Sequence, residues 1–258
     1  MSHRFVFIGA GNLATHLSAE FQKKGFFIEQ VYSRSKKSAA MLARKLDTKY
    51  TTSVAEILPG ADGYFVALKD DAFEKVLPEI KFQNKLLVHC SGSLPLSCLK
   101  DFSSNTGVFY PLQTFSKNRE VEFSDIPVFI EANSPENEKK LIEIAEQISG
   151  RVAVIDSQKR LNLHIAAVFA CNFVNHFYTI AGEVLKSKEI PFNVLKPLIQ
   201  ETAGKVQEME PASAQTGPAV RFDENVIAKH LEELKTLPGF RELYKIISES
   251  IFKFHQNR

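Results

Sequence analysis

Three small residues near the start of the chain have the types and spacing of a dinucleotide-binding turn. Gly9, Gly11 and Ala14 follow the pattern G-x-G-x-x-A, after the apolar run Phe5–Ile8 and before a segment with helical periodicity. The first glycine permits a tight turn, the second lets a pyrophosphate approach the backbone, and the alanine allows close helix–strand packing. The positive end of the helix and its unpaired N–H groups would face the phosphates. The residues predicted to bind the pyrophosphate are Gly9, Ala10, Gly11, Asn12 and Leu13. The alternative is an ordinary strand–helix turn that uses the glycines only for shape.

The choice between NAD and NADP is expected at the end of the second strand, Phe27–Tyr32. An acidic residue there usually holds the ribose 2′-hydroxyl of NAD, whereas an arginine accommodates the 2′-phosphate of NADP. This segment has no acid, and a guanidinium can hold a phosphate through paired N–H donors. We therefore predict NADP as the cofactor, unless the segment is only a solvated basic helix start. The residues predicted to hold the 2′-phosphate are Ser33, Arg34, Ser35 and Lys37.

Apolar runs and helix-period segments alternate over the first 155 residues. Further strands are predicted over Lys49–Thr51, Gly63–Leu68, Lys85–His89, Val108–Tyr110, Pro127–Glu131 and Val152–Ile155. Helices are expected over 38–46, 72–77 and 135–150, and a brief one after Ser53 with Glu56 in a capping box. Such alternation predicts an α/β fold with a doubly wound, mainly parallel Rossmann sheet that is covered on both faces.

Two loops should lie at the carboxyl edge of this sheet, where ligands bind in such folds. Leu68, at the end of one strand, is a predicted cofactor contact, and Asp70 or Asp71 should cap the following helix. After the next strand comes Cys90–Ser93, where Ser91 is a candidate for holding the nicotinamide carboxamide or the substrate. Ser-Gly-Ser is also common turn chemistry, so a purely structural role stays open.

The strand pattern ends near Ile155. Helices are predicted over 157–187, 193–209, 223–235 and 239–256, with Asp223 as an N-cap and Glu210–Pro218 as a loop. We therefore predict a dinucleotide-binding domain over residues 1–155 and a helical domain for substrate binding or dimerisation over residues 156–258.

The first of these helices carries polar residues in an otherwise apolar segment. Helical spacing places Arg160, His164, Cys171, Asn175 and Gly182 on one stripe, with Asn172 and Thr179 beside it. Buried polar groups must be hydrogen-bonded or line a cavity. His164 is the candidate proton donor to the atom made negative by hydride transfer, because histidines exchange protons near neutral pH. Asn172 or Asn175 would orient the substrate. These residues could instead satisfy backbone groups in a helical core.

Arg221 precedes the expected helix start at Asp223 and could bind an anionic group of the substrate, although a surface role is the alternative.

The composition is that of a soluble globular protein, and the net charge of +2 gives no general attraction to nucleic acid or membrane. The three cysteines lack metal-ligand spacing, so we expect no metal site. A strand that begins at Phe5 leaves no room for a signal peptide, so we expect a cytoplasmic location. The apolar segment 163–181 contains histidines and asparagines that are costly in lipid, so we expect no membrane span.

The first half of the chain resembles the NADP-binding domain of pyrroline-5-carboxylate reductases and of deazaflavin-dependent NADP oxidoreductases. Nearly the whole chain is similar to a two-domain Rossmann-like family whose helical C-terminal half is catalogued as a domain of unknown function. The segments that carry these resemblances are Gly9–Ala14, Tyr32–Ser35, Cys90–Ser93, Tyr110–Phe115, His164–Phe173 and Thr216–Arg221. Family members tend to have His in place of Tyr110 and Gly in place of Phe222, so the resemblance assigns no role to either side chain. The reductases' own C-terminal motif for proline synthesis is absent, which argues against that substrate.

The resemblance implies an NADP oxidoreductase that is a homodimer through its helical domain. Together with the residues above, it predicts hydride transfer to or from a small carbonyl or imine compound bound between Ser91 and His164. One alternative is a regulatory or sensing protein that binds NADP without turnover. Another is that the helical half serves only dimerisation, with His164 and Asn172 inside the subunit contact.

Overall fold

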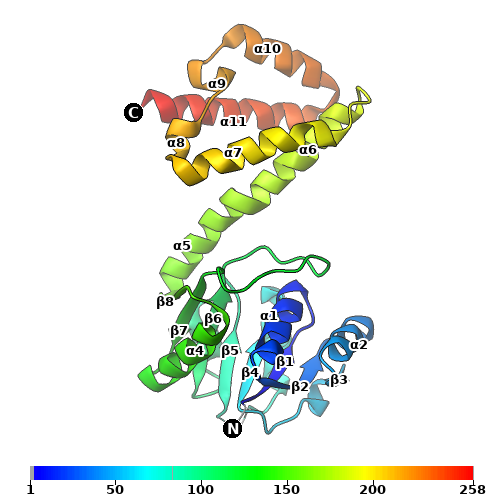
Figure 1. Ribbon diagram of the computed structural model, residues 1–258, viewed down its shortest axis with the longest axis vertical. Helices are drawn as coiled ribbons and strands as arrows, with labels where there is room; N and C mark the ends of the chain where they lie inside the picture. The colour runs from blue at the N-terminus through cyan, green and yellow to red at the C-terminus, as the bar shows by residue number, and fades with distance from the viewer. Residues whose placement is uncertain (1–2, 83, 258) are drawn as a thin grey trace. The chain divides into compact units, whose positions relative to one another are not determined.

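The computed structural model describes residues 3–82 and 84–257. These residues form two compact units that divide between Asn172 and Phe173, each of which can be followed in Figure 1. The sequence pattern changes from strands to helices at Ile155, whereas the two units meet inside a long helix that begins at Ser157. The first turns of that helix pack on the sheet, so they belong to the first unit.

The first unit contains an eight-stranded sheet in the order β3-β2-β1-β4-β5-β6-β7-β8. Its strands are β1 (Arg4–Ile8), β2 (Phe27–Tyr32), β3 (Lys49–Thr51), β4 (Gly63–Val66), β5 (Leu86–His89), β6 (Thr106–Pro111), β7 (Val128–Ala132) and β8 (Val152–Val154). Every neighbouring pair is parallel except β6 and β7, which are antiparallel. The predicted doubly wound, mainly parallel fold is therefore confirmed.

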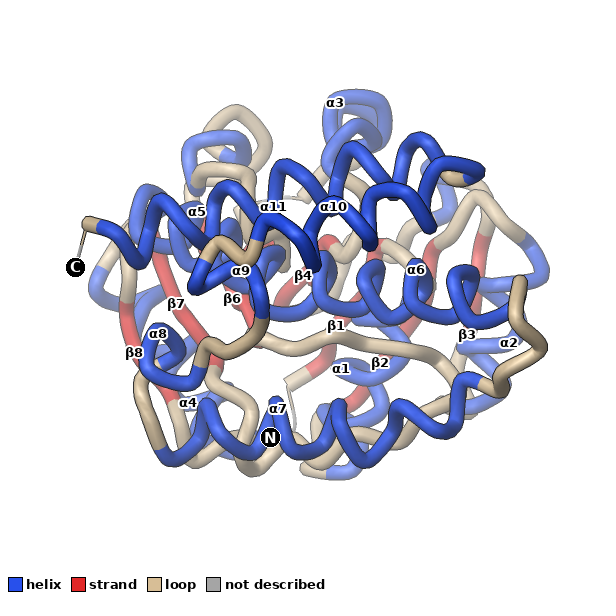
Figure 2. Tube along the Cα trace, turned by 90° about the horizontal axis from the view of Figure 1, so that it is seen from above, coloured by secondary structure: helices blue, strands red, loops and turns tan. Residues whose placement is uncertain are grey.

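Alternate side chains of β1 enter different layers of the core, as the pleat of a strand requires. Phe5 and Phe7 belong to a cluster with residues of α1 (Asn12–Lys23), α2 (Lys36–Lys45) and α4 (Pro135–Ile148). Val6 and Ile8 belong to a second cluster, with residues of α3 (Phe73–Val76). Figure 2 shows α3 on the opposite side of the strands from α1 and α4. Helices thus cover both faces of the sheet.

Two predicted caps are wrong in detail. Ser53 precedes a single 3-10 turn, Val54–Glu56, without a side-chain capping bond, and Glu56 instead accepts a hydrogen bond from the Thr51 hydroxyl. Neither aspartate caps α3, because Asp70 begins a 3-10 turn, Asp70–Ala72, and its carboxylate faces a neighbouring loop. The remaining 3-10 turns of this unit are Leu77–Glu79 and Leu96–Leu99.

The long helix consists of α5 (Ser157–Ala167), a π-helical turn (Val168–Phe173) and α6 (Val174–Lys186). A π turn has i→i+5 hydrogen bonds, so the angular spacing of side chains changes there. The predicted polar stripe assumed constant α-helical spacing and therefore does not continue unbroken from His164 to Asn175. In the described part of the chain this is the one helix long and apolar enough to cross a membrane, with a mean hydropathy of 1.3. Its first turns are fixed to the sheet by the buried Arg160, so we interpret it as part of the globular fold.

The second unit is helical. After α6 its elements are a 3-10 turn (Phe192–Leu195), α7 (Lys196–Glu208), α8 (Pro211–Ala214), α9 (Pro218–Arg221), α10 (Glu224–Glu233), a 3-10 turn (Leu234–Thr236) and α11 (Pro238–Gln256). The segment expected as a loop, Glu210–Pro218, thus includes the single-turn helix α8. Asp223 is the N-cap of α10, as predicted, and its carboxylate accepts a hydrogen bond from the Val226 N–H.

Candidate active site

The turn after β1 requires a glycine at its first position. Gly9 has a φ of 127°, and a Cβ there would lie 2.3 Å from the carbonyl oxygen of Ala67, after β4. Its N–H donates to the Tyr32 carbonyl at the end of β2. The turn is therefore held tightly between the ends of the two strands that flank β1, at the carboxyl edge of the sheet.

The beginning of α1 fits the diphosphate of a dinucleotide. Gly11 is the N-cap residue without a side-chain cap, and no acidic residue stands in the first turn. A Cβ built at Gly11 meets no atom within 4 Å, so the space in front of it is open, whereas Ala14 is fully buried against the sheet. The predicted residues Asn12 and Leu13 follow Gly11 in this first turn. Their arrangement agrees with the phosphate-binding role predicted for the turn, in which backbone N–H groups and the helix dipole attract an anion.

Sequence reasoning missed the loop that lies over this turn. The β6–β7 loop, residues 112–127, reaches the start of α1, as the green segment above α1 in Figure 1 shows. The Asn12 side chain donates to the Phe115 carbonyl at 2.8 Å, and a ring nitrogen of His16 lies 2.9 Å from the Ser116 carbonyl. The ammonium group of Lys117 donates to the Ala10 carbonyl at 2.8 Å. These contacts join segments about 100 residues apart in the chain, so no local sequence pattern predicts them.

The segment predicted to hold a 2′-phosphate forms the start of α2. Arg34 and Lys37 are exposed, and neither forms an ion pair with any described residue. The Ser35 hydroxyl caps the helix by accepting from the Ser38 N–H at 3.3 Å, and the Ser33 hydroxyl accepts from the Ser35 N–H. The two serines therefore shape the turn, and the two cations are free to meet an anion.

The loops after β4 and β5 are linked by an acidic side chain. Asp70 accepts hydrogen bonds from the hydroxyls of Ser91 and Ser93, at 2.9 and 2.5 Å. The Ser91 oxygen also accepts from the N–H groups of Ser93 and Leu94. The hydroxyl proposed to hold substrate or cofactor thus has a structural role in this loop, and its functional role stays a prediction. Leu68 is half-buried and packs on the second core cluster.

The His164 side chain lies directly against the loop after β5. A Cβ on Gly92 would lie 2.6 Å from the His164 ring, so only glycine allows this approach. The other contact is with β6, where the Tyr110 hydroxyl lies 3.0 Å from His164 Nδ1. Burial raises the pKa of Tyr110, against the opposing positive charge of Arg160. The structure therefore places His164 against Gly92, the residue that follows the predicted site residue Ser91 in the chain.

One helical turn before His164, the buried Arg160 fixes α5 in place. Its guanidinium pairs with the Glu131 carboxylate on β7 and donates to the Leu94 carbonyl at 2.6 Å. Glu131 is further bound by the Ser157 hydroxyl in the first turn of α5. This network connects α5 to both the β5 loop and the sheet, and so it sets the position of the His164 ring.

A second histidine supports the same loop from inside the sheet. His89, the last residue of β5, is fully buried, and its Nδ1 accepts from the Ser91 N–H at 3.1 Å. Burial, followed by the charge of Arg160, lowers the pKa of His89 to about 3. The next residue, Cys90, has a thiol whose pKa burial raises to about 12, so it is no nucleophile.

Two further predicted site residues, Asn172 and Arg221, are exposed. Asn172 is exposed within the π-helical turn, eight residues along the chain from His164. Arg221 is exposed at the end of α9 in the helical unit. Their predicted roles toward a substrate stay predictions. Phe222, the next residue, has a φ of 50°, in the left-handed region. Glycine adopts this conformation without strain, which accounts for the glycine that family members tend to have at this position.

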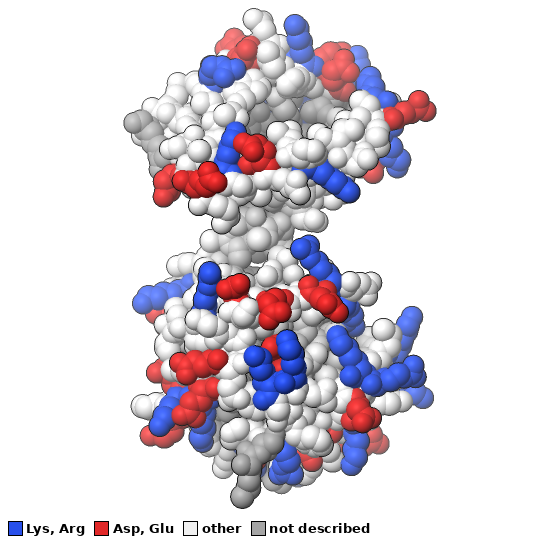
Figure 3. Space-filling view, in the orientation of Figure 1, with Lys and Arg blue, Asp and Glu red and all other residues white. Residues whose placement is uncertain are grey.

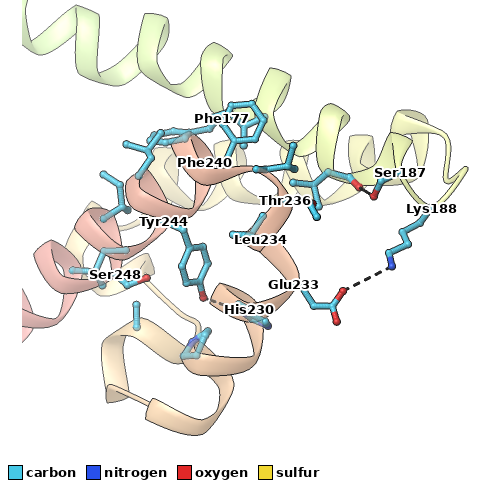
Figure 4. A pocket seen from close by; sticks show the side chains of 18 of the residues that line it. Phe177, Ser187, Lys188, His230, Glu233, Leu234, Thr236, Phe240, Tyr244 and Ser248 are labelled. Atoms are coloured by element: carbon cyan, nitrogen blue, oxygen red, sulfur yellow. Dashed lines mark hydrogen bonds and ion pairs between the residues drawn. The ribbon is translucent and has the colours of Figure 1, made fainter.

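The helical unit has a cavity of its own, with a volume of about 540 Å³ (Figure 4). Phe177, Phe240 and other apolar side chains of α6 and α11 line most of it. Four of its polar side chains are paired with one another: His230 Nδ1 lies 2.7 Å from the Tyr244 hydroxyl, and Lys188 forms an ion pair with Glu233. On the face seen in Figure 3, this unit has a hollow bordered mostly by uncharged side chains, with an adjacent blue and red group just below it.

Two family profiles match the chain. The family described as "NADP oxidoreductase coenzyme F420-dependent" matches residues 4–92. "Domain of unknown function (DUF2520)" matches residues 126–251. A search of curated proteins gave no match.

Solved structures match over almost the full chain. BF3122 from Bacteroides fragilis, described as a "putative NADP oxidoreductase", is 50% identical, with a TM-score of 0.95 and 98% of each chain covered. TM1727 from Thermotoga maritima is 25% identical, with a TM-score of 0.79 over 98% of this chain and 99% of that one. An imine reductase from Myxococcus stipitatus, solved with NADP+, shares the fold at 16% identity, with a TM-score of 0.65 over 98% and 93% of the two chains.

Proposed function

Because the chain belongs to a family of NADP oxidoreductases with a Rossmann domain followed by a DUF2520 domain, we propose that it transfers a hydride between NADP and a small carbonyl or imine compound. The observation that carries this proposal is the packing of His164 on Gly92. It places an imidazole beside the loop after β5, at the sheet edge that also carries the dinucleotide turn. Structures described as pyrroline-5-carboxylate and imine reductases share the fold, which favours an imine or carbonyl substrate class.

In the proposed complex, the open first turn of α1 binds the diphosphate of NADP, and Ser33, Arg34, Ser35 and Lys37 surround its 2′-phosphate. NADPH supplies the hydride when it is bound. The exposed cations of the α2 start support this orientation, because a 2′-phosphate beside them would gain charge-assisted hydrogen bonds.

His164 is the proposed proton donor. The Tyr110 hydroxyl, whose pKa is raised by burial, keeps its proton and donates it in a hydrogen bond to Nδ1. The neutral imidazole then carries one proton, on Nε2. When solvent also protonates Nδ1, the Tyr110 oxygen accepts from it, and the imidazolium delivers its Nε2 proton to the carbonyl oxygen or imine nitrogen as the carbon accepts the hydride, which leaves a neutral imidazole. Solvent restores the proton afterwards. Ser91 and Asn172 are proposed to orient the substrate.

We further propose a cytoplasmic homodimer that associates through the helical unit and binds neither nucleic acid nor membrane. The support comes from burial. Among the described residues from 173 onward, only Ala219 and Ser248 are buried. Apolar side chains with more than half of their surface exposed include Val194, Leu198 and Ile246. A helical unit with so little interior needs a further surface to cover these side chains.

The test is a panel of small carbonyl and imine compounds, with NADPH absorbance as the readout. The wild type should oxidise NADPH with at least one member. His164→Ala should lower turnover by about 100-fold, the usual size of a general-acid contribution, with little change in the Kd for NADPH. Gln158→Ala, an exposed position on the same helix, is the matched control. Tight NADPH binding with no turnover across the panel would favour a regulatory protein. A changed oligomeric state in His164→Ala or Asn172→Ala, at unchanged rate, would place the helix in the subunit contact instead.

A further inference from the structure

The β6–β7 loop holds a lysine at the dinucleotide turn. Lys117 lies 107 residues from Ala10 in the chain, and its ammonium group is 2.8 Å from the Ala10 carbonyl oxygen. Among the described residues it forms no ion pair, and its only hydrogen-bond partner is that neutral carbonyl. A lysine that meets a neutral acceptor keeps most of its charge available to an anion that arrives beside it.

The loop that carries Lys117 is anchored at several points. Phe123 and Ile126 are buried in the core on the α1 side of the sheet. The Phe115 ring stacks on Phe123 at 5.8 Å and on His16 at 5.4 Å. With the hydrogen bond from Asn12 to the Phe115 carbonyl, these contacts determine where the loop crosses the start of α1. The position of Lys117 is thus a built feature of the fold.

We propose that Lys117 binds the diphosphate of the dinucleotide, with the β6–β7 loop acting as a clamp over the first turn of α1. This inference rests on the proposed cofactor site and adds a cation to it that the glycine pattern does not contain. The turn supplies only backbone N–H groups and the helix dipole, which together balance part of the charge of a diphosphate. An ammonium group beside the same turn supplies a full positive charge, and its bond to a phosphate oxygen is stronger than its bond to a neutral carbonyl.

The experiment separates the diphosphate from the 2′-phosphate with two probes. NADP+ carries both groups, whereas adenosine 2′-monophosphate carries only the second. Isothermal titration of Lys117→Ala should give a Kd for NADP+ about tenfold above the wild type, or roughly 1.4 kcal/mol, and an unchanged Kd for adenosine 2′-monophosphate. Arg34→Ala should weaken both probes. Lys139→Ala is the matched control, because Lys139 is an exposed lysine of α4, which follows β7 at the opposite edge of the sheet.

Two conservative variants separate the charge from the structural tie to Ala10. Lys117→Gln keeps a hydrogen-bond donor without charge, and Lys117→Arg keeps the charge. We expect Arg to restore the affinity for NADP+ and Gln to leave it weak, with a smaller dependence on salt concentration than in the wild type. Full restoration by Gln, or an unchanged Kd in Lys117→Ala, would overturn the inference while leaving the proposed function intact. A wild type that binds neither probe would overturn both.

Discussion

The proposed preference for NADP depends on a few exposed side chains at the end of β2. Arg34 and Lys37 have no acidic partner among the described residues, and no acid occupies residues 33–37. A bond between a guanidinium and a phosphate contributes about 1.5–3 kcal/mol, as is usual for hydrogen bonds to charged groups. We therefore predict that Arg34→Asp raises the Kd for NADP+ at least tenfold and leaves the Kd for NAD+ within about twofold. Titration calorimetry measures both values. Equal losses for the two nucleotides would remove the argument for specificity.

Tyr110 gains a role that the family resemblance did not assign to it. Its hydroxyl is the partner of His164 Nδ1, and it packs edge-on against the imidazole at 6.0 Å. Tyr110→Phe removes the hydroxyl while keeping the ring, so the imidazole loses the bond that is proposed to select its Nε2–H tautomer. Nitrogen-15 NMR of His164, assigned by its loss in His164→Ala, should then show a mixture of tautomers.

The kinetic consequence is separate from the spectroscopic one. Turnover in Tyr110→Phe should fall about tenfold, as expected for a positioning residue that contributes roughly 1.4 kcal/mol. The Kd for NADPH should not change, and Tyr110→His should restore part of the rate, since histidine can also donate to Nδ1. An unaltered NMR signature would show that Tyr110 contributes only packing.

At the scale of elements, the two glycines after β1 should differ in what they contribute. Gly9 has a positive φ and no room for a Cβ, whereas Gly11 has a φ of −79° and open space around it. Gly9→Ala should therefore lower the free energy of unfolding by about 2–4 kcal/mol, through backbone strain and a clash. Gly11→Ala should fold normally but bind NADP+ more weakly, because the added methyl group would occupy part of the proposed diphosphate site. Urea unfolding and calorimetry together distinguish the two effects.

The loop after β5 should make stability sensitive to acid. His89 has a pKa of about 3 in the folded protein, against 6.5 for an ordinary histidine. Below pH 6.5, His89 binds a proton in the unfolded chain but stays neutral in the folded protein. The free energy of unfolding therefore decreases as the pH falls from 6.5 toward 3. For this one residue the loss between pH 7 and pH 5 is about 2 kcal/mol.

Urea unfolding at pH 7 and at pH 5 measures this dependence. His89→Gln cannot titrate, so the difference between the two pH values should shrink by about 2 kcal/mol, whatever its own stability at pH 7. His3→Gln, at an exposed position before β1, is the control and should keep the wild-type difference. If His89→Gln keeps the wild-type difference in the free energy of unfolding between pH 7 and pH 5, a group other than His89 causes the loss of stability in acid.

The elements that sequence reasoning predicted well are those with a local signal. β1 and the turn after it were predicted because an apolar run and a glycine pattern are both contiguous in the chain. The π-helical turn at Val168–Phe173 was missed, because its apolar composition also suits an α-helix. Asp70 was predicted as a cap because caps are local, whereas its actual partners, Ser91 and Ser93, are more than 20 residues away. Lys117 was missed for the same reason.

At the scale of the whole molecule, the helical unit poses the main question of stability. Residues 173–257 contain only two buried side chains, and a domain of that size normally buries more than half of the surface that its unfolded chain exposes. Isologous pairing of two copies is the commonest way to cover such apolar helices. Cover by a second copy also agrees with the mostly apolar lining of the cavity in Figure 4, in which His230 is paired with Tyr244 and Lys188 with Glu233.

We therefore predict that the protein sediments as a dimer and that its Tm rises with protein concentration, since association stabilises the folded state by mass action. Leu198, with 63% of its surface exposed on α7, is the position to test. Leu198→Asp places a charge in the proposed contact, so it should produce monomers with a lower Tm. Gln200→Asp introduces the same charge two residues further along the helix, on a different side, and should leave the dimer intact. If Leu198→Asp stays dimeric with an unchanged Tm, the second copy does not cover α7. The contact between the two copies would then be formed by the apolar surface of α6 and α11, which is the other apolar surface of this unit.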